Sequence, residues 1–184
     1  PDDDNDGVDD VDDDCSQGNQ PWTSSSSNDH DTDGCHDTIE DSDDDDDGVN
    51  DGSDSCPLGQ IGWVSNSGSD NDGDGCKDNT GEDTDDDNDG ILDVDDDCPR
   101  GDVGWSPSGT TDYDSDGCQD SAEDSDDDND RVSDGNDACP KGNLGWTSTA
   151  ATDSDGDGCQ DSTGEDTDDD NDGVADSTDN CRFT

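Results

Sequence analysis

Residues 2–15 read DDDNDGVDDVDDDC, and the spacing within this stretch recurs along almost the whole chain. Aspartate occupies positions one, three and five, a glycine follows in eight of nine copies, and further carboxylates come near positions nine and twelve. Five copies, here called A loops, end in a cysteine and begin at Asp2, Asp43, Asp85, Asp126 and Asp168. Four copies, here called B loops, carry a cysteine directly after the glycine and begin at Asp29, Asp70, Asp112 and Asp153.

This spacing matches the oxygen requirement of Ca²⁺. The ion takes about six to eight oxygen ligands, and a chain curled around it presents side chains at positions one, three and five, a carbonyl at seven and carboxylates near nine and twelve. The glycine allows a sharp turn with positive φ. We therefore predict that each of the nine loops binds calcium, with about one to two ions per loop.

The predicted ligands follow directly from these positions. In the A loops they are Asp2, Asp4, Asp6, Val8, Asp10, Asp13, Asp43, Asp45, Asp47, Val49, Asp51, Asp54, Asp85, Asp87, Asp89, Ile91, Asp93, Asp96, Asp126, Asp128, Asp130, Val132, Asp134, Asp137, Asp168, Asp170, Asp172, Val174, Asp176 and Asp179. In the B loops they are Asp29, Asp31, Asp33, Asp37, Glu40, Asp70, Asp72, Asp74, Asp78, Glu82, Asp112, Asp114, Asp116, Asp120, Glu123, Asp153, Asp155, Asp157, Asp161 and Glu165.

The composition leaves no room for an ordinary core. The chain has 61 acidic and 5 basic side chains, a formal charge of −56, and only 18% hydrophobic residues. Such a chain cannot bury enough apolar surface to offset its conformational entropy, so a solvated, disordered acidic tail is the alternative interpretation. The fixed register of glycine, cysteine and tryptophan favours loops that fold around metal, with the metal supplying the folding energy.

The same composition argues against several function classes. Catalytic carboxylate pairs need environments that push two pKa values apart, which exposed aspartates sharing ions do not offer, so we expect no enzyme. A charge of −56 repels phosphate and therefore nucleic acid. No apolar run is long enough for a membrane span.

The cysteines define a tandem repeat. They lie at positions 15, 35, 56, 76, 98, 118, 139, 159 and 181, so that a unit of 41 or 42 residues holds two cysteines. The predicted repeats are 16–56, 57–98, 99–139 and 140–181, with a partial repeat at 1–15 and the start of another at 182–184. This pattern is typical of a segment cut from a longer array.

Constant spacing predicts the disulfides. The gap of 20 residues is invariant, whereas the alternate gap varies with an inserted glycine, so a cross-link should close the constant segment. The predicted pairs are Cys15–Cys35, Cys56–Cys76, Cys98–Cys118 and Cys139–Cys159, and Cys181 would pair outside these residues. Zinc is the alternative use of cysteine, but there is no Cys-x-x-Cys pair. Paired cysteines without a core indicate an oxidising compartment, hence an extracellular or cell-surface location.

A tryptophan lies seven residues after the first cysteine of each pair, at Trp22, Trp63, Trp105 and Trp146. We expect each to pack over a disulfide. Its expected apolar neighbours are Ile61, Val103, Leu144 and the residue after the loop glycine position, which is Val8, Val49, Ile91, Val132 or Val174. Carbohydrate stacking or a partner contact is the alternative role of these rings.

The A loops resemble the thrombospondin type 3 repeats. The resemblance rests on DDDNDGVDDVDDDC, DDDDDGVNDGSDSCP, DDDNDGILDVDDDCP, DDDNDRVSDGNDACP and DDDNDGVADSTDNC, and it covers nearly the whole chain. It implies an extracellular, calcium-wrapped chain with little regular secondary structure and consecutive disulfides. In this chain the second cysteine follows the loop glycine directly, as in DTDGCHD, whereas the family places it several residues later.

Two function classes remain. The first is a structural one, in which calcium stiffens an elongated rod, stalk or filament that serves in cell adhesion or as a surface appendage. The second is a calcium reservoir or a mineral-nucleating protein. Regular spacing favours the rod, because stacked repeats need a fixed register. We also expect O-glycans on the serine- and threonine-rich segments after each tryptophan, and like chains as partners in a fibre.

Overall fold

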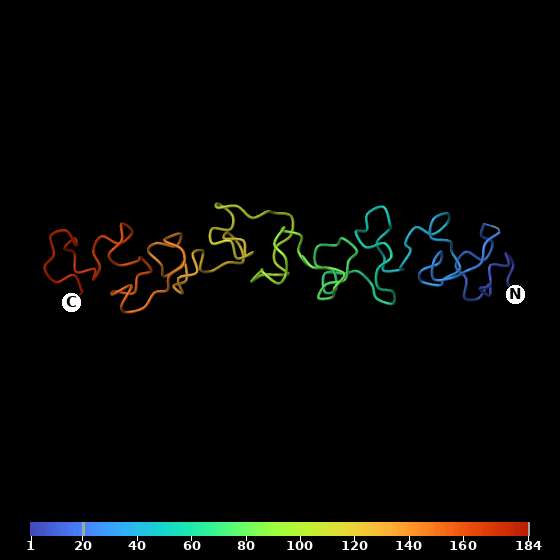
Figure 1. The fold of residues 1–184 in the computed structure, drawn as a ribbon, viewed down its shortest axis with the longest axis horizontal. Helices are drawn as coiled ribbons and strands as arrows, with labels where there is room; N and C mark the ends of the chain where they lie inside the picture. The colour runs from blue at the N-terminus through green and yellow to red at the C-terminus, as the bar shows by residue number, and fades with distance from the viewer. Residues whose placement is uncertain (20, 184) are drawn as a thin grey trace. The chain divides into compact units, whose positions relative to one another are not determined.

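A computed structural model describes residues 1–19 and 21–183 (Figure 1). Throughout these residues the backbone forms turns and bends, without an α-helix or a β-strand. The prediction of an irregular fold is therefore confirmed. Among the described residues there is also no helix with the length and apolar character that a membrane crossing requires.

The irregular backbone has a local cause in the aspartate side chains. In the A loops the third aspartate accepts a hydrogen bond from the backbone N–H two residues later, as in Val8 N to Asp6 Oδ1 at 2.8 Å and Val49 N to Asp47 Oδ1 at 2.7 Å. Such side-chain acceptors compete with the backbone pairing of helices and sheets. The glycine of the loop turns the chain at positive φ, with a value of 98° at Gly48.

The chain divides into two compact units, Pro1–Asp86 and Asp87–Thr184. Each unit holds two of the four predicted disulfides, and the structure confirms all four pairings. The Cα atoms within each pair are 5.1 or 5.2 Å apart. The boundary between the two units falls inside the A loop that begins at Asp85.

Carboxylates, not apolar side chains, fill the interior. The buried hydrophobic residues of the described chain are the second cysteines of the four disulfides, Cys35, Cys76, Cys118 and Cys159. In contrast, Asp6, Asp29, Asp45, Asp47 and Asp130 have no solvent exposure at all. The interior of this fold therefore contains carboxylate groups where most folds place apolar side chains.

The prediction that apolar residues cluster around each tryptophan is wrong for four of those residues, which are exposed. Ile61, Val103 and Leu144 are exposed by 53%, 52% and 51%, and Val174 is exposed by 42%. Val8, Val49, Ile91 and Val132 are half-buried. The physical reason is that the carboxylates and their turns occupy the space that an apolar cluster would need.

The four tryptophan rings are half-buried, and Trp22 and Trp63 lie against the residue that follows the second cysteine. The Trp22 ring meets the His36 ring edge-on at 4.9 Å between centroids, and Lys77 Nζ lies 5.6 Å from the Trp63 ring centroid. The indole nitrogens of all four rings are shielded from solvent and have no hydrogen-bond partner. This favours local packing beside the disulfide as their role.

Candidate metal sites

The A loop at Asp43 shows how the chain builds a cation site. One oxygen of Asp43 and one of Asp47 accept a backbone N–H, from Gly48 to Asp43 Oδ2 at 3.0 Å and from Val49 to Asp47 Oδ1 at 2.7 Å. Both oxygens of Asp45 accept one, from Asp47 at 3.3 Å and from Gly59 at 2.9 Å. Asp54 Oδ1 likewise accepts the N–H of Cys56 at 2.6 Å. The turn thereby orients the second oxygen of Asp43, Asp47 and Asp54.

These second oxygens lack a protein partner. Asp43 Oδ1, Asp47 Oδ2 and Asp54 Oδ2 are all shielded from solvent without a hydrogen bond. Ligand oxygens of Asp43, Asp45 and Asp47 also lie within 4.8 Å of one another. A buried, unpaired carboxylate is costly, by several kcal/mol, unless a cation compensates it. The first, third and fifth positions of this loop could therefore hold a metal ion.

The same arrangement recurs in other A loops. In the loop at Asp126, the shielded oxygens without a partner are Asp126 Oδ1, Asp130 Oδ2 and Asp137 Oδ2, and in the first loop they are Asp6 Oδ2 and Asp13 Oδ2. Burial, followed by the charges of Asp128, Asp130 and Asp126, raises the pKa of Asp137 to about 6. The twelfth position thus faces positions one, three and five, as predicted for a shared ion. The predicted ligands of the loop at Asp85 fall on both sides of the unit boundary.

In the loops at Asp43 and Asp126 the ninth aspartate accepts a backbone hydrogen bond, and its role as a calcium ligand stays a prediction. Asp51 Oδ1 accepts the N–H of Asp44 at 3.0 Å, and Asp134 Oδ1 accepts that of Asp127 at the same distance. Burial raises the pKa of Asp44 to about 6, and among the neighbouring charges Asp51 adds most to this shift. The ninth aspartate therefore lies beside the second residue of its own loop.

The B loops gather carboxylates in the same way. Ligand oxygens of Asp29, Asp31 and Asp33 lie within 4.8 Å of one another, as do those of Asp70, Asp72 and Asp74. Burial raises the pKa of Asp31 to about 7 and that of Asp33 to about 6, with neighbouring carboxylates adding to both shifts. These groups could also hold metal ions.

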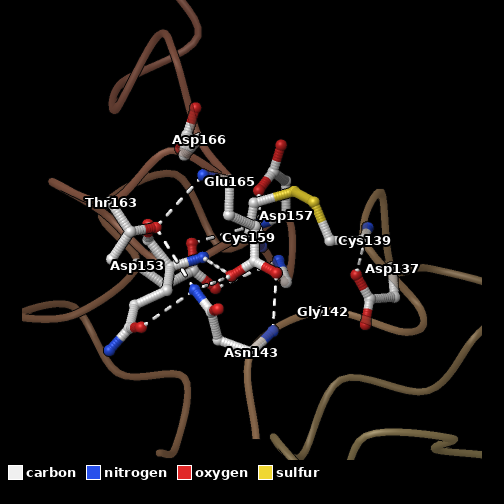
Figure 2. Close-up of a disulfide and its surroundings, with 12 residues drawn as sticks. Asp137, Cys139, Gly142, Asn143, Asp153, Asp157, Cys159, Thr163, Glu165 and Asp166 are labelled. Carbon is white, nitrogen blue, oxygen red and sulfur yellow. Dashed lines mark hydrogen bonds between the residues drawn. A yellow bond between two sulfur atoms is a disulfide. The ribbon is translucent and has the colours of Figure 1, made fainter.

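The glutamate that closes each B loop lies beside the disulfide of its repeat. Figure 2 shows Glu165 near the Cys139–Cys159 disulfide, where its carboxylate accepts backbone hydrogen bonds from Asn143 at 2.7 Å and from Gln160 at 3.0 Å. Glu82 accepts the N–H of Gln60 in the same manner at 2.7 Å. The glutamates therefore tie the segment after the first cysteine to the segment after the second. Their predicted role as calcium ligands stays a prediction.

A serine two residues after tryptophan supports the B loop in three repeats. Ser24 Oγ donates to Asp29 Oδ2, and Ser65 Oγ donates to Asp70 Oδ2 at 2.5 Å. Ser148 Oγ makes the equivalent bond to Asp153 Oδ2 at 2.5 Å. These hydroxyls therefore orient the first aspartate of the loop, a role that the sequence analysis did not assign to them.

Arg131 stands where the other A loops have glycine. Its φ is 82°, its N–H donates to Asp126 Oδ2 at 2.9 Å, and its side chain is exposed. Left-handed backbone costs a non-glycine residue about 1 kcal/mol. Arg131 forms no ion pair within the described residues, so a role as internal counter-ion has no support there.

We expect Arg131→Gly to tighten ion binding at this loop by about fivefold, because about 1.4 kcal/mol corresponds to a factor of ten. The gain combines relief of backbone strain with removal of a positive charge near Asp126, Asp128 and Asp130. Calorimetric titration of the oxidised protein with calcium measures it. The mirror change Gly48→Arg should weaken the equivalent loop, and equal titrations of both variants and the parent would contradict this account.

Comparison with known proteins finds no family model and no curated protein that matches the chain. The resemblance to thrombospondin type 3 repeats therefore stays a prediction from the loop sequences.

Proposed function

We propose that this chain is a calcium-binding structural repeat protein, located outside the cell, in which the ions replace a hydrophobic core. The observation that carries the proposal is the set of buried, unpaired carboxylate oxygens that converge within single loops, such as Asp43 Oδ1, Asp47 Oδ2 and Asp54 Oδ2. Hard carboxylate and carbonyl oxygens without nitrogen or sulfur ligands suit Ca²⁺ better than zinc or copper.

The protein scaffold favours calcium over a small octahedral cation. Each loop offers several carboxylates on a chain of turns, and calcium accepts flexible geometry with about six to eight ligands. Magnesium demands near-ideal octahedral geometry and usually keeps several waters. Four disulfides hold the segments between the loops, which fits an oxidising, extracellular setting.

A rod or filament explains the regularity better than a reservoir does. The disulfide geometry, the fixed backbone acceptors and the glutamate beside the disulfide recur from one repeat to the next, as stacked units require. A calcium store or a mineral nucleator tolerates unequal spacing, so nothing would maintain this register. The repeat therefore serves the shape of the chain, with calcium as its interior.

Small-angle X-ray scattering at saturating calcium tests the rod. We expect the scattering curve of a stiff, elongated particle whose length grows in proportion to the number of repeats when one repeat, residues 57–98, is duplicated. A flexible coil in the presence of calcium, together with unchanged calcium affinity, would instead support the reservoir.

The hydroxyl-rich segments after tryptophan remain the proposed sites of O-glycans. Ser24, Ser65 and Ser148 are used within the fold, but Ser25, Ser26 and their counterparts are exposed. Sugar on the exposed hydroxyls would separate neighbouring chains or join them in a fibre. Cell-surface attachment and adhesion belong to the same proposal.

A further inference from the structure

A group of carboxylates lies at the junction between the last B loop and the A loop that follows it. Asp166 directly follows the glutamate beside the disulfide (Figure 2), and Asp169 is the second residue of the A loop. Neither belongs to the predicted ligand sets, yet Asp166 is only 8% exposed and Asp169 has no solvent exposure. We call Asp161, Asp166 and Asp169 the fourth junction cluster.

Each of the two buried carboxylates has one fixed oxygen and one oxygen without a partner. Asp166 Oδ1 accepts the backbone N–H of Asp168 at 2.8 Å, and Asp169 Oδ1 accepts that of Ser162 at 3.0 Å. Asp166 Oδ2 and Asp169 Oδ2 are shielded from solvent and have no hydrogen-bond partner. Because a buried charge without a partner is strongly destabilising, these two oxygens need a positive charge beside them.

The two buried carboxylates converge with Asp161 from the end of the B loop. The bond from Ser162 brings Asp169 to a residue seven positions earlier, which directly follows Asp161. Burial raises the pKa of Asp161, and among the neighbouring carboxylates Asp169 adds most to this shift, with Asp166 also adding to it. The three side chains of the cluster therefore lie close enough to act on one another.

One basic side chain lies near this cluster, on the side of Asp176. Arg182 Nη2 lies 2.8 Å from Asp176 Oδ2, while Asp176 Oδ1 accepts the N–H of Asp169 at 3.0 Å. The carboxylates of Asp176 and Asp169 also lie beside each other. Within the described residues, Arg182 forms no ion pair with a member of the cluster. Its charge therefore serves Asp176, and the two buried oxygens stay unpaired.

The equivalent group in the third repeat shows which kind of partner fits this junction. Asp127 is there the second residue of its A loop, and it is 6% exposed. Lys141 Nζ donates a hydrogen bond to Asp120 Oδ2 and lies 3.4 Å from Asp127 Oδ2. The residue equivalent to Lys141, two positions after the next cysteine, is Phe183, which is 55% exposed. The third repeat therefore supplies an ammonium at a position where the fourth has a phenyl ring.

We propose that Asp161, Asp166 and Asp169 bind a divalent cation that is distinct from the ions of the two adjacent loops. This inference rests on the proposed calcium function, and hard carboxylate oxygens make calcium the expected occupant. The ion would join the end of the B loop to the start of the A loop. In the third repeat, the Lys141 ammonium joins Asp120 to Asp127 across the same junction.

Native mass spectrometry of the oxidised protein, at a free calcium concentration fixed by a chelator buffer, counts the bound ions. We expect Asp169→Asn to bind one calcium ion fewer than the parent chain. Asp127→Asn is the matched control, because it makes the same change at the equivalent position, where Lys141 already supplies the charge. Its ion count should equal that of the parent.

Phe183→Lys tests the site without altering a carboxylate. It places an ammonium at the position equivalent to Lys141, and the exposed ring that it removes is not part of a packed core. We expect this variant also to bind one ion fewer than the parent.

Three results would overturn the inference while leaving the loops as calcium sites. They are an unchanged ion count in Asp169→Asn, an equal loss in Asp169→Asn and Asp127→Asn, and an unchanged count in Phe183→Lys. The second of these would show that the second position of the A loop acts on its own loop. A parent chain that binds no calcium would overturn the proposed function itself.

Discussion

Removal of calcium from the oxidised protein is expected to unfold the chain between its disulfides. The near-UV circular dichroism of the four tryptophans should fall close to zero, and backbone amides should exchange with solvent within seconds. The chain carries a formal charge of −56, and it buries the carboxylates of Asp6, Asp45, Asp47 and Asp130 completely. Without calcium, its small buried apolar surface cannot offset the repulsion between these charges. Returning calcium should restore both signals because the disulfides keep the pairing.

A matched pair of variants reduces this test to one loop. Asp47 is fully buried with a shielded oxygen, whereas the neighbouring Asp46 is exposed at a φ of 54°. Asp47→Asn should weaken calcium binding in this loop, while Asp46→Asn should have no effect, since asparagine tolerates that backbone region well. A chelated protein that kept its near-UV spectrum and slow exchange would show that the ions do not hold the fold.

Acidification is expected to release the ions, with calcium affinity falling steeply as the pH drops from 7 to 5. Burial and neighbouring carboxylates raise the pKa of Asp31 and Asp114 to about 7 and that of Asp47, Asp130 and Asp155 to about 6. Protons therefore compete with calcium for the same oxygens across this range. We expect a loss of more than tenfold in affinity between pH 7 and pH 5.

The metal-free fold should show the opposite dependence. Its aspartates have pKa values above the value of about 4 in an unfolded chain, so the folded state binds more protons than the unfolded state between about pH 4 and 7. Their contribution to metal-free stability is present below about pH 4 and is lost as the pH rises through 6 to 7. Calcium titrations at several pH values, in buffers of different ionisation enthalpy, measure the protons released per ion. Equal affinities at pH 7.5 and 5 would contradict this view of the sites.

The loops and disulfides could be predicted because their determinants are local. A ligand at position one and its neighbours at three and five come from a single turn, and a constant gap of 20 residues separates Cys56 from Cys76. The exposure of Ile61 and Leu144 was missed because hydrophobicity suggests burial, whereas carboxylates such as Asp45 occupy the interior here.

The grouping of Asp37, Asp41 and Asp44 and the glutamate contacts depend on three-dimensional proximity. Asp44, at position two of its loop, is not among the predicted ligands, and only the folded chain brings it to Asp37 and Asp41. The contact of Glu165 with Asn143 joins residues 22 positions apart. The signal that could have found this group is Asp41, the aspartate that precedes the second A loop by two residues.

The short reach of the contacts has a consequence for how this chain is made. The disulfides join residues 20 positions apart, and the longer hydrogen bonds, from Tyr113 Oη to Gly142 O and between His30 Nε2 and Gly59 O, span 29. Chains with such local contacts fold fast, since little loop-closure entropy separates the partners. If the chain is exported as proposed, it would fold repeat by repeat as it meets external calcium, and each folded repeat would oppose backward movement across the membrane.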